Sequence, residues 1–332
     1  MDKTITIEPL GFPWKTSDPF LFCAFHHDNY PKGNGQFGPS DTLQGRNLRQ
    51  DFSGKDGWSM YHGTKVPGFP AHPHCGFETI TIAEKGMVDH SDSLGAAGRF
   101  GNGDVQWMTA GKGVQHSEMF PLVEDTKENE LLLFQIWLNL PKNKKKVPPF
   151  FKMLWKEDIP AIYLENNTEI KLIAGSYKNK TALSPAPESW ASQTGSEVAI
   201  WIIKSAPHSS FTLPKVNEGT NRSLYFYKGE KVEIAKTSVN VNLRVHIHSY
   251  DEITIKNTGG EAHFLLLQGK PLEEPVVQQG PFVSNSKEGI IEAIRDFQAT
   301  EYGGWPWPNK DQVHDKSKGR FALYPNGEKT YK

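Results

Sequence analysis

Four side chains that commonly bind metal ions occur as two evenly spaced pairs. One residue separates His72 from His74, and one residue separates His116 from Glu118. Residues two apart in a β-strand project from the same face, so each pair can present both side chains to one side of a sheet. Three neutral imidazoles and one carboxylate suit a divalent first-row metal ion, with water or substrate in the remaining positions. The spacing predicts one metal site built from these four residues.

A simpler interpretation is that each histidine is a core residue with an ordinary hydrogen-bonding partner. Polar rings cost free energy when they are buried without partners, which disfavours two such pairs arising by chance. The glycines of the run 110–113 also allow a tight turn that would aim His116 inward. The metal site is therefore the favoured interpretation.

The elements that carry these motifs are predicted to be short strands. The 30 glycines and 23 prolines fall between short apolar runs rather than in one tract. Alternating or continuous apolar patterns predict strands at residues 79–83, 131–138, 169–175, 198–203, 223–227 and 263–267. One helix is predicted over residues 287–297, with Ser286 as its N-cap and Ile290, Ile294 and Phe297 on one face.

A length of 332 residues favours two domains. The proline-bracketed basic run of residues 140–149 cannot continue a central strand and is interpreted as a solvated linker. We therefore expect domains at residues 1–146 and 147–332. Residues 30–57 and 303–332 match no regular pattern and are expected to form ordered loops or arms.

The overall charge argues against several partners. The 37 basic and 38 acidic side chains give a formal charge of −1, which lacks the positive excess that direct nucleic-acid binding requires. The N-terminus has no signal-peptide core, and no apolar run is long enough to cross a membrane. The two cysteines, Cys23 and Cys75, provide no disulfide framework. We expect a soluble, cytoplasmic protein.

Several motifs around the predicted site resemble those of the pirin family, a branch of the cupins. The motifs are His-Pro-His-Cys-Gly-Phe-Glu-Thr at 72–79, His-Ser-Asp-Ser at 90–93, Gly-Asp-Val-Gln-Trp-Met-Thr-Ala-Gly at 103–111 and His-Ser-Glu-Met at 116–119, with further similarity at 135–140, 269–275 and 279–283. The resemblance implies an all-β bicupin: two tandem jelly-roll-like antiparallel β-barrels with a short C-terminal helix. It places the metal in the N-terminal barrel and its ligands on His72, His74, His116 and Glu118.

Three neighbouring residues leave alternatives open. Cys75 stands where many pirins have arginine, so it is either a small buried residue or a redox-sensitive thiol. Glu78 lies four residues after His74, so it is expected on the same strand face as the histidines, and it has the spacing of the glutamate ligand in other cupins. The resemblance assigns that role to Glu118 and leaves Glu78 for hydrogen bonding around the ligands. His90 is interpreted as a surface turn residue in preference to a hydrogen-bonding partner of the ligands.

The second half of the chain repeats part of the histidine pattern. His246, His248 and Glu252 have the spacing of the first motif, and His263 follows a glycine as His116 does. The chain between His248 and His263 is too short for the strands of a comparable barrel, and Leu265 stands where a carboxylate would be needed. These histidines are interpreted as strand-end and surface residues rather than as a second site.

The resemblance implies quercetin 2,3-dioxygenase activity, in which dioxygen opens a flavonol ring with release of carbon monoxide. Glu118 would be the catalytic base on the flavonol 3-hydroxyl. The expected ion is Fe²⁺, with Cu, Mn, Ni, Co or Zn as alternatives. The resemblance also implies a monomer, although exposed sheet edges would permit a dimer.

A second interpretation is a regulatory protein whose metal state controls binding to a transcription factor or a metabolic enzyme, without turnover. Residues 142–146 and 305–308 would be its contact points. A third is metal-dependent hydrolysis or isomerisation on the same scaffold, which would be independent of oxygen.

Overall fold

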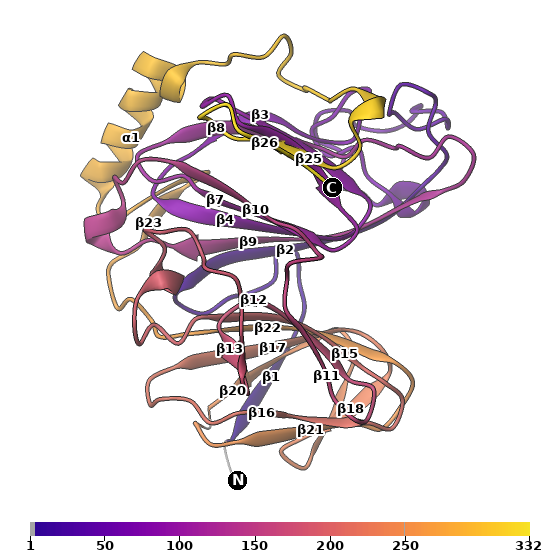
Figure 1. Cartoon of the computed structure of the whole chain (residues 1–332), viewed down its shortest axis with the longest axis vertical. Coiled ribbons are helices and arrows are strands. Elements are labelled where there is room, and N and C mark those ends of the chain that lie inside the picture. The colour runs from indigo at the N-terminus through magenta and orange to yellow at the C-terminus, as the bar shows by residue number, and fades with distance from the viewer. Residues whose placement is uncertain (1–3, 249) are drawn as a thin grey trace. The chain divides into compact units, whose positions relative to one another are not determined.

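The computed structural model describes residues 4–248 and 250–332, which form two compact units (Figure 1). Unit 1 contains the chain up to Cys23, Trp137–Asn139 and Glu157–Glu273, and unit 2 contains Ala24–Ile136, Leu140–Lys156 and Glu274–Lys332. The expected division of the chain into domains at 1–146 and 147–332 stays a prediction, and its first three residues lie outside the described part.

Unit 1 is built from two antiparallel sheets that enclose one apolar core. The larger sheet has the order β1-β20-β17-β22-β15-β12-β11, and the smaller has the order β16-β21-β18-β19. The strands are β1 (Ile5–Pro9), β11 (Ala161–Tyr163), β12 (Glu169–Ala174), β15 (Ala199–Ser205), β16 (Ser210–Leu213), β17 (Asn221–Lys228), β18 (Lys231–Ile234), β19 (Thr237–Asn240), β20 (Leu243–Ile247), β21 (Ile253–Asn257) and β22 (Ala262–Gly269). Aliphatic and aromatic side chains of both sheets fill the interior, including Trp201, Phe226 and Phe264.

Unit 2 is also formed by two antiparallel sheets, and it carries the predicted metal residues. Its sheets have the orders β26-β25-β6-β5-β8-β3 and β10-β7-β4-β9-β2. The strands are β2 (Phe20–Tyr30), β3 (Gly68–His74), β4 (Phe77–Lys85), β5 (Met87–Asp92), β6 (Ala97–Gly101), β7 (Asp104–Thr109), β8 (Val114–Met119), β9 (Asn129–Asn139), β10 (Phe150–Leu154), β25 (Phe321–Leu323) and β26 (Lys329–Tyr331). The apolar core of this unit includes Phe100, Leu131 and Leu133.

Short elements complete the chain. They are the strand pairs β13 (Ser176–Tyr177) with β14 (Lys180–Thr181) and β23 (Val277–Gln279) with β24 (Phe282–Ser284), and the 3-10 turns η1 (Lys55–Gly57), η2 (Lys142–Lys144), η3 (Trp190–Ser192), η4 (Glu301–Gly303) and η5 (Lys316–Lys318). Within the described residues, α1 (Lys287–Thr300) is the single α-helix. No helix there is long and apolar enough to cross a membrane.

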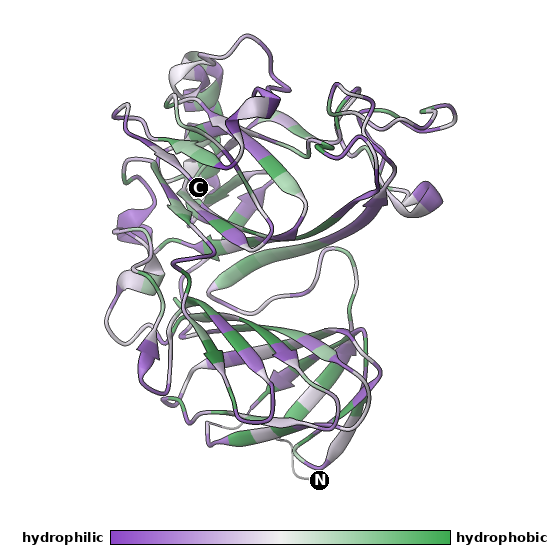
Figure 2. Cartoon of the chain, turned by 45° about the vertical axis from the view of Figure 1, so that its right-hand side comes forward, coloured by the Kyte–Doolittle hydropathy of each residue, from purple (hydrophilic) through white to green (hydrophobic). Residues whose placement is uncertain are grey.

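The predicted strands and helix are confirmed by the structure. Each predicted strand range overlaps an observed strand, and hydrophobic segments lie along these strands while the loops are largely hydrophilic (Figure 2). The Ser286 side chain caps α1 by accepting the Gly289 N–H at 3.1 Å. Ile290, Ile294 and Phe297 pack on one apolar cluster, as their helical spacing predicted.

Two expectations about irregular segments are corrected. The C-terminal stretch is not merely a loop or arm, because β25 and β26 extend the six-stranded sheet of unit 2. The basic run is not wholly solvated, because Lys145 is buried and donates from Nζ to the Gly76 carbonyl at 2.8 Å. In both segments the structure is determined by tertiary contacts, which short-range sequence patterns do not reveal.

Candidate metal centre

Strands β3 and β8 bring the predicted histidines together. Their antiparallel register pairs His72 with His116 and His74 with Val114. A close backbone contact holds the two strands at the other end of β3, where Gly68 has a φ of 127° and a Cβ would lie 2.5 Å from the Glu118 carbonyl oxygen. Only glycine fits such a position without strain. The register therefore sets three imidazoles on one face of the six-stranded sheet.

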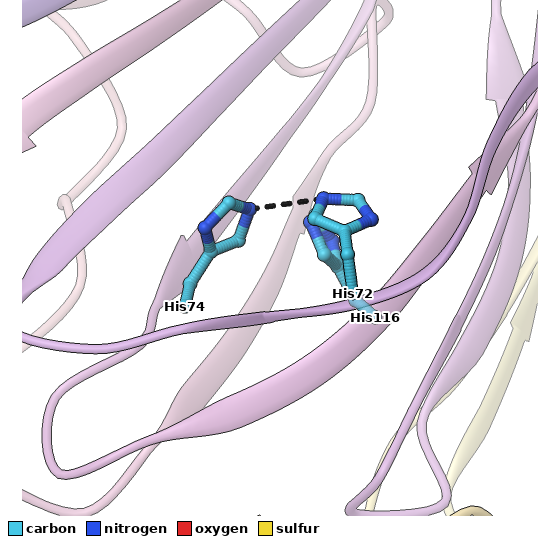
Figure 3. A group of neighbouring side chains, drawn as sticks. All are labelled: His72, His74 and His116. Carbon is cyan, nitrogen blue, oxygen red and sulfur yellow. Dashed lines mark hydrogen bonds between the residues drawn. The ribbon is translucent and has the colours of Figure 1, made fainter. Parts of the chain in front are cut away.

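The three rings converge through their Nε2 atoms (Figure 3). His72 Nε2 lies 3.1 Å from His74 Nε2 and 3.1 Å from His116 Nε2. The ligand atoms of the three residues all lie within 4.8 Å of one another, so this cluster could hold a metal ion. His74 and His116 are buried, whereas His72 is partly exposed. His72 is therefore the member of the cluster that is partly open to solvent.

The protonation of this cluster suits a cation. Burial lowers the pKa of His72 to about 4 and lowers the pKa values of His74 and His116 well below the ordinary value, so the rings are neutral near pH 7. His72 Nδ1 lies 2.9 Å from the Pro70 carbonyl oxygen, which can only accept a hydrogen bond. The proton of the neutral ring is thus on Nδ1, and its Nε2 lone pair faces the other two histidines.

Glu118 is next to the cluster and is held by two polar side chains. Its Oε2 lies 3.7 Å from His116 Nε2 and accepts a hydrogen bond from Gln135 Nε2 at 2.6 Å. Burial raises the pKa of Glu118, while hydrogen bonds from Thr81 and Gln135 oppose the rise. The Thr81 hydroxyl lies 2.8 Å from Glu118 Oε1 and 2.6 Å from Gln135 Oε1. Because a hydroxyl has one hydrogen, both contacts are satisfied together only when the carboxyl carries a proton.

His90 also faces this interior, so its interpretation as a surface residue is wrong. It is fully buried on β5, opposite Glu118 on β8. Its ring lies 5.5 Å from that of His116 and stacks on Phe151 at 5.1 Å. Its Nε2 lies 3.3 Å from an oxygen of Asp92, while its Nδ1 is buried without a protein partner. His90 thus forms part of the wall around His116 and Glu118.

Glu78 lies on the other face of its strand. Its Oε1 accepts hydrogen bonds from Trp107 Nε1 at 3.1 Å and Thr109 Oγ1 at 2.7 Å. Thr81, three positions further along β4, points instead toward Glu118. The two-residue period of a strand does not continue from His74 to Glu78, because the chain turns at Gly76, where φ is 87°. The expectation that Glu78 shares the histidine face is therefore wrong.

Cys75 is in the interior, as expected of a small buried residue. It is 8% exposed, and its Sγ lies 3.5 Å from the Gly111 carbonyl oxygen. Burial raises the pKa of its thiol, so the reactive thiolate is disfavoured. The side chain packs with Phe282, Ile290 and Tyr302, which ties β3 to α1.

In unit 1, His248 and His263 of the second histidine pattern have ordinary partners, whereas His246 Nδ1 is buried without a hydrogen-bonding partner. His248 Nε2 lies 3.1 Å from Thr6 Oγ1, and His263 Nε2 lies 2.6 Å from Glu261 Oε1. His246 is on β20 opposite Thr6 of β1, and Leu265 is fully buried.

Sequence reasoning missed the residues that orient Glu118. Thr81 and Gln135 come from β4 and β9, far from Glu118 in the sequence. One signal was present: Thr79 and Thr81 alternate with isoleucines in a strand that is buried on both faces. Polar residues repeating every second position in such a strand indicate a polar interior.

A buried hydrogen-bonded chain of three side chains lies beside Phe69. His26 Nδ1 lies 2.9 Å from Tyr61 Oη, and the Tyr61 hydroxyl donates to Asp28 Oδ2 at 2.6 Å. Burial lowers the pKa of His26 to about 4 and raises that of Asp28 to about 6. Between about pH 4 and pH 6, unfolding therefore takes up a proton at His26 and releases one at Asp28.

In the wild type, these two effects on the pH dependence of the free energy of unfolding should cancel. In the Asp28→Asn variant, the Asp28 effect is removed. With only His26 left, the unfolded state binds more protons, so the free energy of unfolding should fall as pH falls, by about 1.4 kcal/mol per pH unit between roughly pH 6 and 4.5. Urea titrations of both metal-free proteins at several pH values would measure the difference, since all other groups contribute equally. Parallel pH profiles would contradict this assignment.

Comparisons with known proteins agree with this architecture. Residues 15–138 match the family model described as Pirin, and residues 200–303 match the Pirin C-terminal cupin domain. A Pseudomonas aeruginosa protein named "Putative quercetin 2,3-dioxygenase" is 34% identical over 235 residues, covering 70% of this chain and 79% of that protein. Pirin-1 of Arabidopsis thaliana is 36% identical over 241 residues, covering 71% and 78%.

A solved structure supports the same assignment. The crystal structure titled quercetin 2,3-dioxygenase from Acinetobacter baumannii superposes with a TM-score of 0.68 at 29% identity, covering 86% of each chain. The expected all-β bicupin fold, with antiparallel sheets and a short C-terminal helix, is thereby confirmed. The chain belongs to the pirin family of bicupins.

Proposed function

We propose that this protein is a metal-dependent dioxygenase that opens the central ring of flavonols of the quercetin type. His72, His74, His116 and Glu118 would hold one divalent ion, with Fe²⁺ as the working ion, in a monomer. The observation that carries the proposal is the convergence of three neutral imidazoles beside a buried carboxyl. The names of the Pseudomonas and Acinetobacter relatives supply the substrate class.

The donor set fits a cation. His72 Nε2 lies within contact distance of the Nε2 atoms of His74 and His116, and its lone pair is directed at them. These nitrogens repel one another unless a proton or a cation lies between them. Imidazole and carboxylate ligands suit iron, and a redox-active ion supplies electron transfer between an electron-rich substrate and dioxygen.

Glu118 would be the base for the flavonol hydroxyl. Gln135 donates to Oε2, and Thr81 contacts Oε1, so both oxygens keep a fixed orientation toward His116. Because its pKa is raised, the Glu118 carboxylate binds a proton more tightly than an ordinary glutamate does. This favours proton transfer to it from a weakly acidic hydroxyl. A proton on Glu118 would complete the ring of hydrogen bonds with Thr81 and Gln135. The protein thus has a place for the substrate proton.

The proposal is tested by oxygen uptake after anaerobic reconstitution with Fe²⁺. Wild type should consume oxygen in proportion to quercetin loss and release carbon monoxide. Glu118→Ala should reduce the rate at least about 100-fold, because it removes both a ligand and the base. Glu130→Ala is the matched control, since Glu130 is a surface carboxylate of the same unit paired with Lys85 at 2.6 Å; it should behave as wild type.

The alternatives predict different results. Tight Fe²⁺ binding with no oxygen uptake for any flavonol would overturn the dioxygenase proposal and favour metal-dependent regulation of a protein partner. Activity that persists without oxygen and with zinc would indicate hydrolysis or isomerisation instead. Full activity of Glu118→Ala would show that this carboxyl is neither ligand nor base.

A further inference from the structure

Aromatic side chains lie beside His72, the partly exposed histidine of the cluster. His72 is the partly exposed member of the cluster, and the Phe69 ring lies 6.3 Å from its ring. The rings of His62 and Phe52 lie 5.4 Å and 6.3 Å from Phe69. We name Phe52, His62 and Phe69 the aromatic rim. Through Phe69, the rim adjoins the partly exposed member of the cluster.

The rim leaves apolar and polar groups open to solvent. Phe52 is 46% exposed, although large apolar side chains are ordinarily buried. Its ring lies 5.2 Å from that of His62 in an edge-to-face arrangement, and His62 is also exposed. An aromatic face with a polar neighbour is the surface that a planar, hydroxylated ring would cover.

Backbone hydrogen bonds hold the loop that carries Phe52 and His62, while Phe69 is on β3. The backbone groups of Asp51 and Tyr61 pair in both directions, at 2.9 Å and 2.8 Å, which closes the loop between Phe52 and His62. Trp58 of this loop stacks with the guanidinium of Arg46, which precedes the loop in the chain and lies 3.2 Å from the ring centre. A rigid platform loses little conformational entropy when a ligand binds.

Positive backbone angles shape this loop. Arg49 and Tyr61 both have positive φ values, 73° and 56°. Non-glycine residues adopt this conformation at a cost that the surrounding structure must offset. The Arg49 carbonyl is thereby directed at the His62 ring, where it accepts a hydrogen bond from Nδ1.

That hydrogen bond fixes the tautomer of His62. A carbonyl oxygen can only accept, so Nδ1 carries the hydrogen. In the neutral ring, Nε2 is therefore an acceptor, and it is suited to a hydroxyl donor such as a phenol. Phe52 provides the apolar contact, and His62 provides the polar one.

We propose that the aromatic rim is the substrate-recognition subsite, in which Phe52 and Phe69 contact a planar aromatic ring and His62 Nε2 accepts a hydrogen bond from a phenolic hydroxyl of that ring. This inference rests on the proposed function, because it assigns the rim to the same substrate. Phe52 and His62 are specificity-determining residues, and neither contacts the three-histidine cluster directly.

Binding is measured separately from turnover by titrating flavonols into the reconstituted protein without oxygen. The probes are three flavonols that differ only in the number of hydroxyls on the phenyl substituent: none, one or two. Phe52→Ala should weaken binding of all three about tenfold, because a ring contact of this kind contributes on the order of a kcal/mol beyond its buried area. Phe12→Ala is the matched control, as Phe12 is 59% exposed in unit 1.

His62→Phe keeps a ring and removes the acceptor. It should weaken binding of the hydroxylated flavonols about fivefold, the size of one hydrogen bond, and leave the flavonol without these hydroxyls within about twofold. His27→Phe is the control, since His27 is an exposed histidine paired with Glu130. In turnover assays with oxygen, both rim variants should raise KM with little change in kcat.

The outcomes separate this inference from the proposed function. The subsite would be upheld and the dioxygenase proposal overturned if the rim variants weaken flavonol binding while the wild type takes up no oxygen. Oxygen uptake with unchanged binding in both rim variants would overturn the subsite alone. A change in sedimentation of Phe52→Ala would overturn the subsite in favour of a contact between two copies of the chain.

Discussion

Replacing His116 with glutamine should abolish high-affinity metal binding while leaving the fold intact. His116 is fully buried, and its Nε2 lies near both His72 Nε2 and Glu118 Oε2, at 3.1 Å and 3.7 Å. Glutamine approximates the size of imidazole but offers an amide, which is a much weaker ligand for first-row ions. We expect affinity to fall at least about 100-fold, since losing even the groups that orient a ligand costs 10–100-fold.

Cobalt(II) is a convenient probe for this prediction, because its visible spectrum reports the ligands. Anaerobic titration against a chromophoric chelator would give the affinity, and circular dichroism would verify the fold. The matched control is His263→Gln, which removes a histidine paired with Glu261 in unit 1. One equivalent of tightly bound cobalt in the His116→Gln variant would refute the proposed ligand set.

Residue spacing predicted the histidine cluster because strand geometry is periodic over short distances. His72 and His74 are on one strand, and His116 and Glu118 are on another, so the two-residue period applies within each pair. The pairing of β3 with β8 then needed only the correct register, which aligns His72 with His116. The same reasoning failed for Glu78, because the turn at Gly76 separates it from the strand of His74.

Contacts made by segments distant in sequence could not be predicted. Thr81 and Gln135 meet Glu118 only after three strands have assembled, and no local pattern in the sequence encodes that contact. The aromatic rim likewise depends on the conformation of an irregular loop closed by Asp51 and Tyr61. Loop conformations of this kind are fixed by individual hydrogen bonds and positive φ angles rather than by hydrophobic periodicity.

The Arg99→Met variant should be destabilised by about 3–5 kcal/mol, because it leaves the buried Asp89 carboxylate without its charged partner. Arg99 Nε and Nη2 donate to the two oxygens of Asp89, each at 2.7 Å, and both side chains are buried. Asp89 also accepts the His314 N–H at 2.7 Å, and Arg99 donates to the His314 carbonyl at 2.7 Å. Urea unfolding of the metal-free protein would measure the loss.

The same ion pair fastens the C-terminal segment to β5, so the destabilisation should have a local signature. In Arg99→Met, limited proteolysis should cut near His314 before the rest of unit 2. Lys316→Met is the control: Lys316 pairs with Asp125 at 2.5 Å but is about half exposed, and such surface pairs contribute about 0–1 kcal/mol. Because Asp89 adjoins His90 in the wall around His116, release of this segment should also weaken cobalt binding. Wild-type affinity in a destabilised Arg99→Met would show that the C-terminal segment supports the fold without supporting the metal centre.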